Sequence, residues 1–247
     1  MSDVSSGAVV ASAVVVAADI AAGGALAGSA LSRARVSDRS VTVKGISERD
    51  VRADAAIWPL RLVSADNDLT QANRQLAATE EKVKASLERH GIPASDAAPR
   101  GFRVADAFAD PYRPAGQVAR RYVLEVTVLV RSTKPDVALA ASQAVSKIIQ
   151  EGVVLSTRGD YEASGPIFLF TGLNAVKPPM IAEATARGRE AAEQFARDSK
   201  SRLAGIRKAS QGLFEILPRD QAPGIREERQ IEKRVRVVST VEYFLVD

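Results

Sequence analysis

The chain has 247 residues, of which 46% are hydrophobic and 26% are charged, so it is long enough to bury a core of its own. Its net charge is +4, from 34 basic and 30 acidic residues that are interspersed, and only 5% of its residues are aromatic. Nucleic-acid-binding proteins usually cluster their basic residues, so we expect no nucleic-acid partner. The absence of cysteine excludes disulfides, thiolate metal ligands and cysteine nucleophiles.

The chain begins with an apolar stretch, residues 7–31, whose only charge is Asp19. Its length suits a bilayer span, which needs about 20 residues. However, a central carboxylate costs about 2.5–3.5 kcal/mol and cancels most of the gain from the few strongly apolar side chains. We favour a single-pass membrane anchor. A signal peptide with a cleavage site near residues 25–27 (Ala-Leu-Ala) and a soluble alanine-rich helix are the alternatives.

The orientation of such an anchor is ambiguous, because basic residues follow the apolar stretch. These are Arg33, Arg35, Arg39 and Lys44. The positive-inside rule would place the rest of the chain in the cytoplasm. We divide the chain into residues 1–37, an anchor or signal segment with a linker, and residues 38–247, one α+β domain.

The first elements of this domain are two predicted strands. Residues 40–44 and 51–63 alternate apolar and polar side chains, which is the period of a half-buried strand. Trp58 and Leu60 share one face of the second strand. Pro59 lies between them and has no N–H, which predicts an edge position or a bulge.

A helix and two more strands complete the first half. Asp66 and Asp68 offer N-caps, apolar residues at helical spacing follow over 69–87, and His90-Gly91 predicts the end of the helix. A strand begins near Phe102, and residues 122–131 alternate clearly as an antiparallel strand with one solvated face.

The second half repeats this order. Its predicted elements are a helix over 133–148, strands over 152–156 and 166–171, a helix over 178–204, and strands over 213–217 and 235–245. The buried face of the long helix is predicted to carry Met180, Ala184, Ala191, Phe195 and Leu203. In each half, a helix is followed by a Gly-Ile pair, a strand, a Pro/Gly loop and a long strand. We predict an α+β fold of duplicated strand-helix-strand-strand units, in which antiparallel sheet packs with long helices, plus an N-terminal apolar helix.

Few side chains suggest chemistry. His90 is the only histidine, which excludes paired-histidine metal sites, and no phosphate-binding, dinucleotide-binding or nucleophile-elbow motif is present. The carboxylate pairs are interpreted as helix caps or turn residues; they are Asp66 and Asp68, Asp106 and Asp110, and Asp160 and Glu162. Trp58 is interpreted as a core residue. Arg120 and Arg121 form either a solvated strand end or a receptor for an anionic partner. We expect no catalytic, cofactor-binding or metal-binding residues and no enzymatic activity.

Short stretches resemble a known family. They are residues 41–45 (VTVKG) with Glu48 and Arg49, residues 52–54 (RAD) with 58–60 (WPL), the alanine-rich 182–196 with 203–206 (LAGI), and the closing 241–245 (VEYFL). Over about residues 38–247 the chain is similar to the SIMPL-domain family of bacterial exported and membrane-tethered proteins. The resemblance implies an extracytoplasmic α+β protein. Some members form ring-like oligomers, and others are periplasmic immunogenic or oxidative-stress-defence proteins.

Two functions follow as expectations. The first is a non-enzymatic envelope protein that acts by self-assembly, as a homo-oligomer, in stress defence. The alternative is an anchored monomeric module that binds a ligand or a protein partner, which predicts a concave pocket with a few convergent polar groups. The resemblance places the protein in the inner membrane, with one N-terminal pass and a periplasmic body. Release into the periplasm after cleavage is the alternative.

Overall fold

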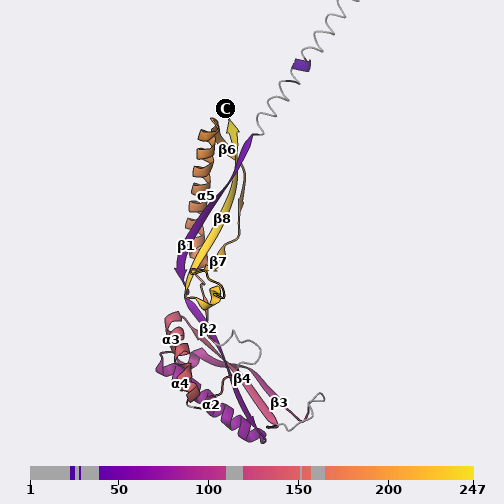
Figure 1. The fold of residues 1–247 in the computed structure, drawn as a ribbon, viewed down its shortest axis with the longest axis vertical. Coiled ribbons are helices and arrows are strands. Elements are labelled where there is room, and N and C mark those ends of the chain that lie inside the picture. The colour runs from indigo at the N-terminus through magenta and orange to yellow at the C-terminus, as the bar shows by residue number, and fades with distance from the viewer. Residues whose placement is uncertain (1–22, 26–27, 29–38, 110–118, 151, 157–164) are drawn as a thin grey trace, which may run out of the picture. The chain divides into compact units, whose positions relative to one another are not determined.

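The computed structural model describes residues 23–25, 28, 39–109, 119–150, 152–156 and 165–247 (Figure 1). The chain divides into two units. Unit 1 comprises Met1–Ser47, Pro179–Phe214 and Val237–Asp247, and unit 2 comprises Glu48–Pro178 and Glu215–Arg236. Three elements contribute residues to both units: strands β1 (Ser40–Arg52) and β8 (Glu232–Val246) and helix α5 (Leu173–Asp198).

Unit 1 is a sheet with one helix on it. The strand order is β1-β8-β6, where β6 is Arg202–Gln211, and helix α5 packs on one face. Strand β8 alternates buried and half-buried residues, because side chains of a strand point to opposite faces in turn. The strand predicted over 235–245 is therefore confirmed, and it extends over Glu232–Val246. The core of unit 1 contains Val41, Ala192, Ala196, Val241, Tyr243 and Leu245.

Helix α5 approaches strand β1 so closely that only glycine fits at the contact. A Cβ added to Gly45 would lie 1.8 Å from the carbonyl oxygen of Ala184 and 2.5 Å from the backbone nitrogen of Gly188. The buried face of α5 is correspondingly small: Met180, Ala184, Gly188, Ala192 and Ala196. The prediction that Ala191 and Phe195 are buried is wrong, and Phe195 is 51% exposed. A large side chain on the inner face would hold the helix away from Gly45.

The bounds of α5 also differ from the prediction of 178–204. The helix begins at Leu173, because the carboxylate of Asp54 accepts hydrogen bonds from the N–H groups of Thr171 and Gly172 just before it. It ends at Asp198, where Lys200 takes a positive φ of 52° and Ser201 N–H donates to the carbonyl of Ala196. The residues that follow form strand β6, which the sequence did not predict.

Unit 2 contains a second antiparallel sheet, ordered β3-β4-β2-β5. Its strands are β2 (Ala55–Asp66), β3 (Ala97–Asp106), β4 (Tyr122–Ser132) and β5 (Ile167–Leu169), and its helices are α2 (Leu69–Arg89), α3 (Pro135–Gln143) and α4 (Val145–Gln150). Single 3-10 turns lie at Ala94–Asp96 and Glu227–Arg229, and β7 (Glu215–Pro218) pairs with Lys233–Arg236 of β8.

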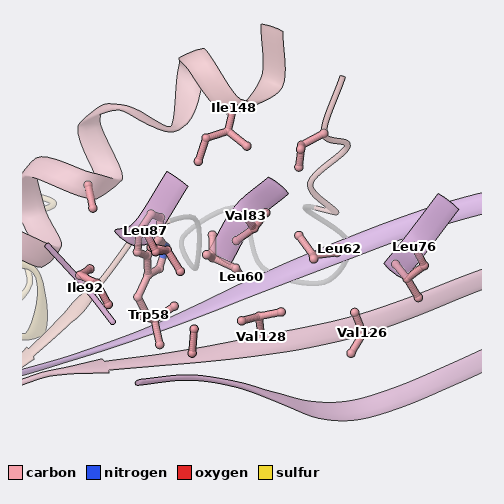
Figure 2. Close-up of a cluster of buried hydrophobic side chains, with 14 of the residues drawn as sticks. Trp58, Leu60, Leu62, Leu76, Val83, Leu87, Ile92, Val126, Val128 and Ile148 are labelled. Atoms are coloured by element: carbon pink, nitrogen blue, oxygen red, sulfur yellow. The ribbon is translucent and has the colours of Figure 1, made fainter. Parts of the chain in front are cut away.

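The core of unit 2 lies between this sheet and helices α2 and α4. Figure 2 shows the side chains of Trp58, Leu60 and Leu62 of β2 pointing toward the buried face of α2. Other members of this core are Leu76, Val83, Leu87, Ile92, Val126, Val128 and Ile148. The predicted common face of Trp58 and Leu60 is confirmed, and Trp58 is only 1% exposed.

Several predicted elements of unit 2 are confirmed and others are corrected. Asp68 caps α2 by accepting from Gln71 N–H at 2.9 Å, and His90 is the C-cap. The helix expected over 133–148 is instead two helices divided at Ala144. The strand expected over 152–156 is a single bridge between Leu62 and Leu155. The α+β class is therefore confirmed, whereas the duplicated plan stays a prediction.

The N-terminal segment is mostly outside the described part of the chain. Residues 23–25 and 28 are helical, and the remainder of 7–31, including Asp19, lies outside the described residues, as do residues 29–38 with the proposed domain boundary. Among the residues that are described, no helix combines the length and the apolarity required to cross a membrane.

Candidate functional site: a pocket beside strand β2

A pocket of about 610 Å³ lies in unit 2 between strand β2 and helix α2. This volume is within the range of about 300–1,000 Å³ that is typical of small-ligand sites. Three parts of the chain form its walls: the end of β2, one stripe of α2, and a rim that contains Arg120, Gly152 and Val154. We call it the β2 pocket.

The helical wall of the β2 pocket is a single stripe of three polar side chains and one alanine. Gln75, Ala78, Thr79 and Lys82 occur at i, i+3, i+4 and i+7, so they share one face of α2. The hydroxyl of Thr79 donates to the carbonyl of Gln75 at 2.8 Å, so its oxygen can still accept a hydrogen bond from a ligand. This stripe lies beside the apolar stripe that packs into the core.

The strand wall is a sheet edge that is only partly paired. Val63 N–H donates to the carbonyl of Val154 at 3.3 Å, and Ser156 N–H donates to the carbonyl of Arg61 at 2.8 Å. This pairing stops there, because Gly152 and Val153 donate instead to the carbonyls of Ile149 and Ile148. Gly152 adopts a φ of 86°, which turns the chain away from β2.

Ala65 continues the row of backbone groups that begins with Arg61 and Val63. Alternate residues of a strand direct their N–H and C=O groups to the same side, so those of Ala65 face the β2 pocket. Within the described residues, no backbone hydrogen bond reaches Ala65 from this side. The wall therefore offers one donor and one acceptor in the geometry of a strand edge.

Two basic side chains, Lys82 and Arg120, line the β2 pocket, and Asp66 lies close by. The N–H of Asp68 and, more weakly, the Nε2 of Gln75 and the charge of Arg120 hold the pKa of Asp66 below its usual value. Asp66 is therefore ionised at neutral pH and already bound. The lining contains no carboxylate, so the guanidinium of Arg120 favours an anionic ligand.

The structure separates the two arginines that the sequence brought to attention. Arg121 forms a bidentate pair with Asp106, with its Nη2 at 3.0 Å from Oδ2, and its guanidinium lies over the rings of Phe108 and Tyr122 at 5.2 and 4.8 Å. This is the solvated strand end that the sequence predicted. Arg120 instead lines the β2 pocket, so the alternative, a receptor for an anion, stays a prediction for Arg120 alone.

The other candidate residues have structural roles or lie outside the described residues. His90 Nδ1 is 2.8 Å from the carbonyl of Ser86 in the last turn of α2, Asp68 caps the start of this helix, and Asp66 accepts from the N–H of Asp68. Residues 110, 160 and 162 (Asp, Asp and Glu) lie outside the described part. In the described ranges no three His, Asp or Glu side chains gather closely enough to hold a metal ion.

Sequence reasoning did not identify Gln75, Thr79 and Lys82. Their helical spacing could have indicated the site. It places them in a polar stripe beside the apolar stripe of α2, and such a stripe faces a surface other than the core. What the sequence could not show is that the backbone leaves β2 at Gly152, since this depends on the end of α4. The opening beside Ala65 results from that turn.

The short stretches that suggested a family resemblance have packing roles. Gly45 permits the close approach of α5, Asp54 holds the turn before α5, and Trp58 fills the core of unit 2. None of these three residues lines the β2 pocket. A resemblance that rests on such residues therefore specifies the fold and says little about a ligand.

Comparison with protein families identifies a family whose function is unknown. A family model described as "SIMPL: Protein of unknown function (DUF541)" matches residues 41–242. No curated protein matches the chain. Two similar solved structures are an uncharacterized conserved protein and a hydrolase, both from Listeria innocua. They are 13% and 14% identical, cover 77% of this chain and 91% and 90% of their own, and have TM-scores of 0.17 and 0.19. Such TM-scores support no inference about activity.

Proposed function

Because the chain belongs to the SIMPL family, whose function is unknown, we propose a function from the geometry of the β2 pocket. The protein is a non-enzymatic module of the cell envelope that binds an anionic ligand or partner in this pocket. This is the alternative among the two functions expected from the sequence, and the concave β2 pocket with its polar lining supports it.

One observation carries the proposal: the β2 pocket combines an open strand edge, two basic side chains and an apolar floor in about 610 Å³. The apolar part comes from Val63, Ala78 and Val154. A site with these three components can orient a ligand by hydrogen bonds and gain affinity from apolar contact. Nothing in the lining resembles a nucleophile paired with a base, which is why the proposal is binding rather than catalysis.

The placement in the envelope belongs to the same proposal. We propose one N-terminal pass through the inner membrane and a periplasmic body, or release into the periplasm after cleavage, on the strength of the apolar stretch 7–31. A C-terminal reporter fusion that is active only in the periplasm would support this. A reporter that is active only in the cytoplasm would contradict it.

Thermal unfolding of the full chain with a panel of small anions tests the binding function. The panel contains amino acids, dicarboxylates, phosphate and short peptides. A ligand at about 100 times its Kd stabilises a protein by about 2.7 kcal/mol, which raises Tm by roughly 5–10 °C at this chain length. Ala78→Trp should fill the β2 pocket and abolish the shift.

The matched control is Ala77→Trp, because Ala77 is the exposed neighbour on α2 and does not line the pocket. A ligand that stabilises the wild type and Ala77→Trp but not Ala78→Trp binds in the β2 pocket. If no member of the panel stabilises the wild type, or if Ala78→Trp responds as the wild type does, the proposed function fails.

Self-assembly is the second candidate, and the exposure of strand β3 favours it. Strand β3 is at the end of its sheet, and its seven residues from Pro99 to Ala105 are all exposed. Phe102 and Val104 are 57% and 46% exposed. An unpaired edge with apolar side chains is a template for pairing with a second copy of the chain. Strand β6 is also at the end of its sheet.

Light scattering tests this candidate. The wild type should form an oligomer, and Val104→Lys should dissociate it, because a charge on an edge strand opposes pairing. Thr127→Lys, on the neighbouring strand β4, is the control that should leave the oligomer intact. A monomeric wild type at high concentration would exclude self-assembly and leave the binding proposal unaffected.

A further inference from the structure

We propose that the β2 pocket binds the carboxyl-terminal end of a short extended peptide, which adds as a strand to the open edge at Ala65. The inference rests on the proposed binding function and names the class of ligand. It follows from three features of the pocket: the direction of the free backbone groups, the position of the cations and the shape of the apolar wall.

The backbone groups specify an extended peptide. Segment 154–156 already lies along β2 as a short antiparallel neighbour, bonded at Arg61 and Val63. The next group in this row, Ala65, has the strand geometry but no neighbour within the described residues. An added peptide continues the existing ladder here, donating to the carbonyl of Ala65 and accepting from its N–H. At about 3.3 Å per residue, the edge beyond Val63, from Ser64 to Asp66, accommodates two or three residues.

The pattern of β2 itself indicates that this edge is used selectively. Pro59 belongs to the same outward row, between the stretch paired with β5 and the stretch paired with 154–156. Proline has no N–H to offer a neighbour. Strand addition is therefore excluded at Pro59, while Ala65 keeps both its donor and its acceptor. The open position is next to the basic side chains of the pocket.

The charges specify the end of the peptide. Arg120 precedes β4, whose Val123 pairs with Ala65 on the other side, and Lys82 faces the pocket from α2. A terminal carboxylate beside Ala65 can thus pair with Arg120, because a planar guanidinium binds a carboxylate with two parallel hydrogen bonds. The hydroxyl of Thr79 and the side-chain carbonyl of Gln75 accept from a peptide N–H. Val63, Ala78 and Val154 contact a small apolar side chain.

Fluorescence anisotropy with the full chain tests the inference. The probe is a pool of fluorescein-labelled pentapeptides of Gly, Ser, Ala and Val, prepared once with a free carboxyl terminus and once as the amide. Hydrogen bonds to charged groups contribute about 1.5–3 kcal/mol, so the amides should bind roughly 10–100 times more weakly. Arg120→Gln should lower the affinity for the free carboxylate to a similar degree, whereas it should not change the affinity for the amide.

Two control variants separate the contribution of Arg120 from that of the strand edge at Ala65. Arg100→Gln removes an exposed arginine of β3 outside the β2 pocket and should change nothing. Ala65→Pro removes the N–H of the strand edge and keeps both cations. It should therefore lower the affinity for the peptide and leave the affinity for succinate unchanged. Because Ala65→Pro can fail to fold, the wild type also supplies an amide measurement: the NMR signal of Ala65 N–H should shift downfield when the peptide is added.

The inference is overturned by several results. One is the absence of peptide binding up to about 1 mM. The others are equal affinity for carboxylate and amide, an unchanged NMR signal of Ala65 N–H, and displacement of the peptide by succinate or phosphate at the peptide's own concentration. If a pocket-filling substitution abolishes binding of another panel member while the peptides fail, the proposed function stands and only this inference falls.

Discussion

The two units solve the packing of a helix on a sheet in opposite ways. In unit 1, helix α5 presents Ala184, Gly188, Ala192 and Ala196 to the sheet, and its backbone touches Gly45. In unit 2, helix α2 presents Leu76, Val83 and Leu87 to a sheet that carries Trp58 and several large aliphatic residues (Figure 2). In unit 1 the contact is stabilised by the close approach of two backbones, and in unit 2 it is stabilised by the burial of large side chains.

This difference determines which substitutions each unit tolerates. A core of large side chains loses stability when a side chain is shortened, because a cavity remains. A contact between backbones loses stability when a side chain is lengthened, because the added atoms have no space. Hydrogen exchange of α2 and of α5 reports in which unit stability is lost, so it tests whether the two units differ in this way.

The largest effect is expected in unit 2, for Trp58→Ala. Trp58 is 1% exposed in the middle of the core, and removing a large aromatic side chain typically costs about 3–5 kcal/mol. Urea unfolding followed by circular dichroism measures the loss, and hydrogen exchange should accelerate in α2 and β4 but much less in the unit 1 part of α5.

Trp58→Phe is the matched control. The indole N–H of Trp58 finds no acceptor within the described residues, so a phenyl ring breaks no hydrogen bond and keeps most of the volume. Its cost should be clearly smaller than that of Trp58→Ala. An equal cost for both variants would mean that side-chain volume does not determine the stability of unit 2.

The next largest effect is expected in unit 1, for Gly45→Ala. The added methyl group would lie 1.8 Å from a backbone oxygen of α5, and overpacking that requires a backbone shift costs about 1–3 kcal/mol or more. Gly205→Ala, in β6 of the same unit, meets nothing within 4 Å and should leave the stability nearly unchanged. Accelerated exchange should be confined to α5 and β1 of unit 1. A Gly45→Ala protein with the wild-type midpoint of unfolding would contradict the close contact.

The sequence predicted correctly those elements that are determined by residues close together in the chain. The cap of α2 at Asp68, its end at His90 and the alternation of β4 and β8 all follow from residues within a few positions. The errors have distant causes. Phe195 is predicted to face inward because it is large and apolar, whereas the distant Gly45 selects alanine and glycine for that face.

Other features depend on contacts that no local pattern encodes. The start of α5 depends on Asp54, and strand β6 follows a left-handed turn at Lys200, a residue type that rarely adopts it. Lys233 belongs to the buried row of β8 and is fully buried, because its ammonium group binds Glu227. The β2 pocket likewise joins residues from β2, α2 and two loops, so only Arg120 was visible beforehand as a candidate for an anion.

The smallest effect concerns acid, and it too distinguishes the units. The hydrogen bonds from Arg121 and from Phe108 N–H hold the pKa of Asp106 below its usual value of about 3.9. In unit 2, hydrogen bonds from Arg234 to Asp50 and from Asp68 N–H to Asp66 also lower the pKa of these carboxylates. In unit 1, the hydrogen bond from Ser40 lowers the pKa of Glu242.

A carboxylate with a lowered folded-state pKa contributes stability that is fully present above its unfolded pKa and is lost as the pH falls through its folded pKa. Unit 2 should therefore lose more stability than unit 1 below about pH 4.

Asp106→Asn should be less stable than the wild type at pH 6, and this difference should shrink as the pH falls below the usual pKa of the carboxyl group. Urea midpoints at pH 6 and pH 2.5 measure it, with Glu242→Gln as the counterpart in unit 1. If the difference between Asp106→Asn and the wild type is the same at both pH values, the Asp106–Arg121 pair does not stabilise the folded state, and the two units differ in packing alone.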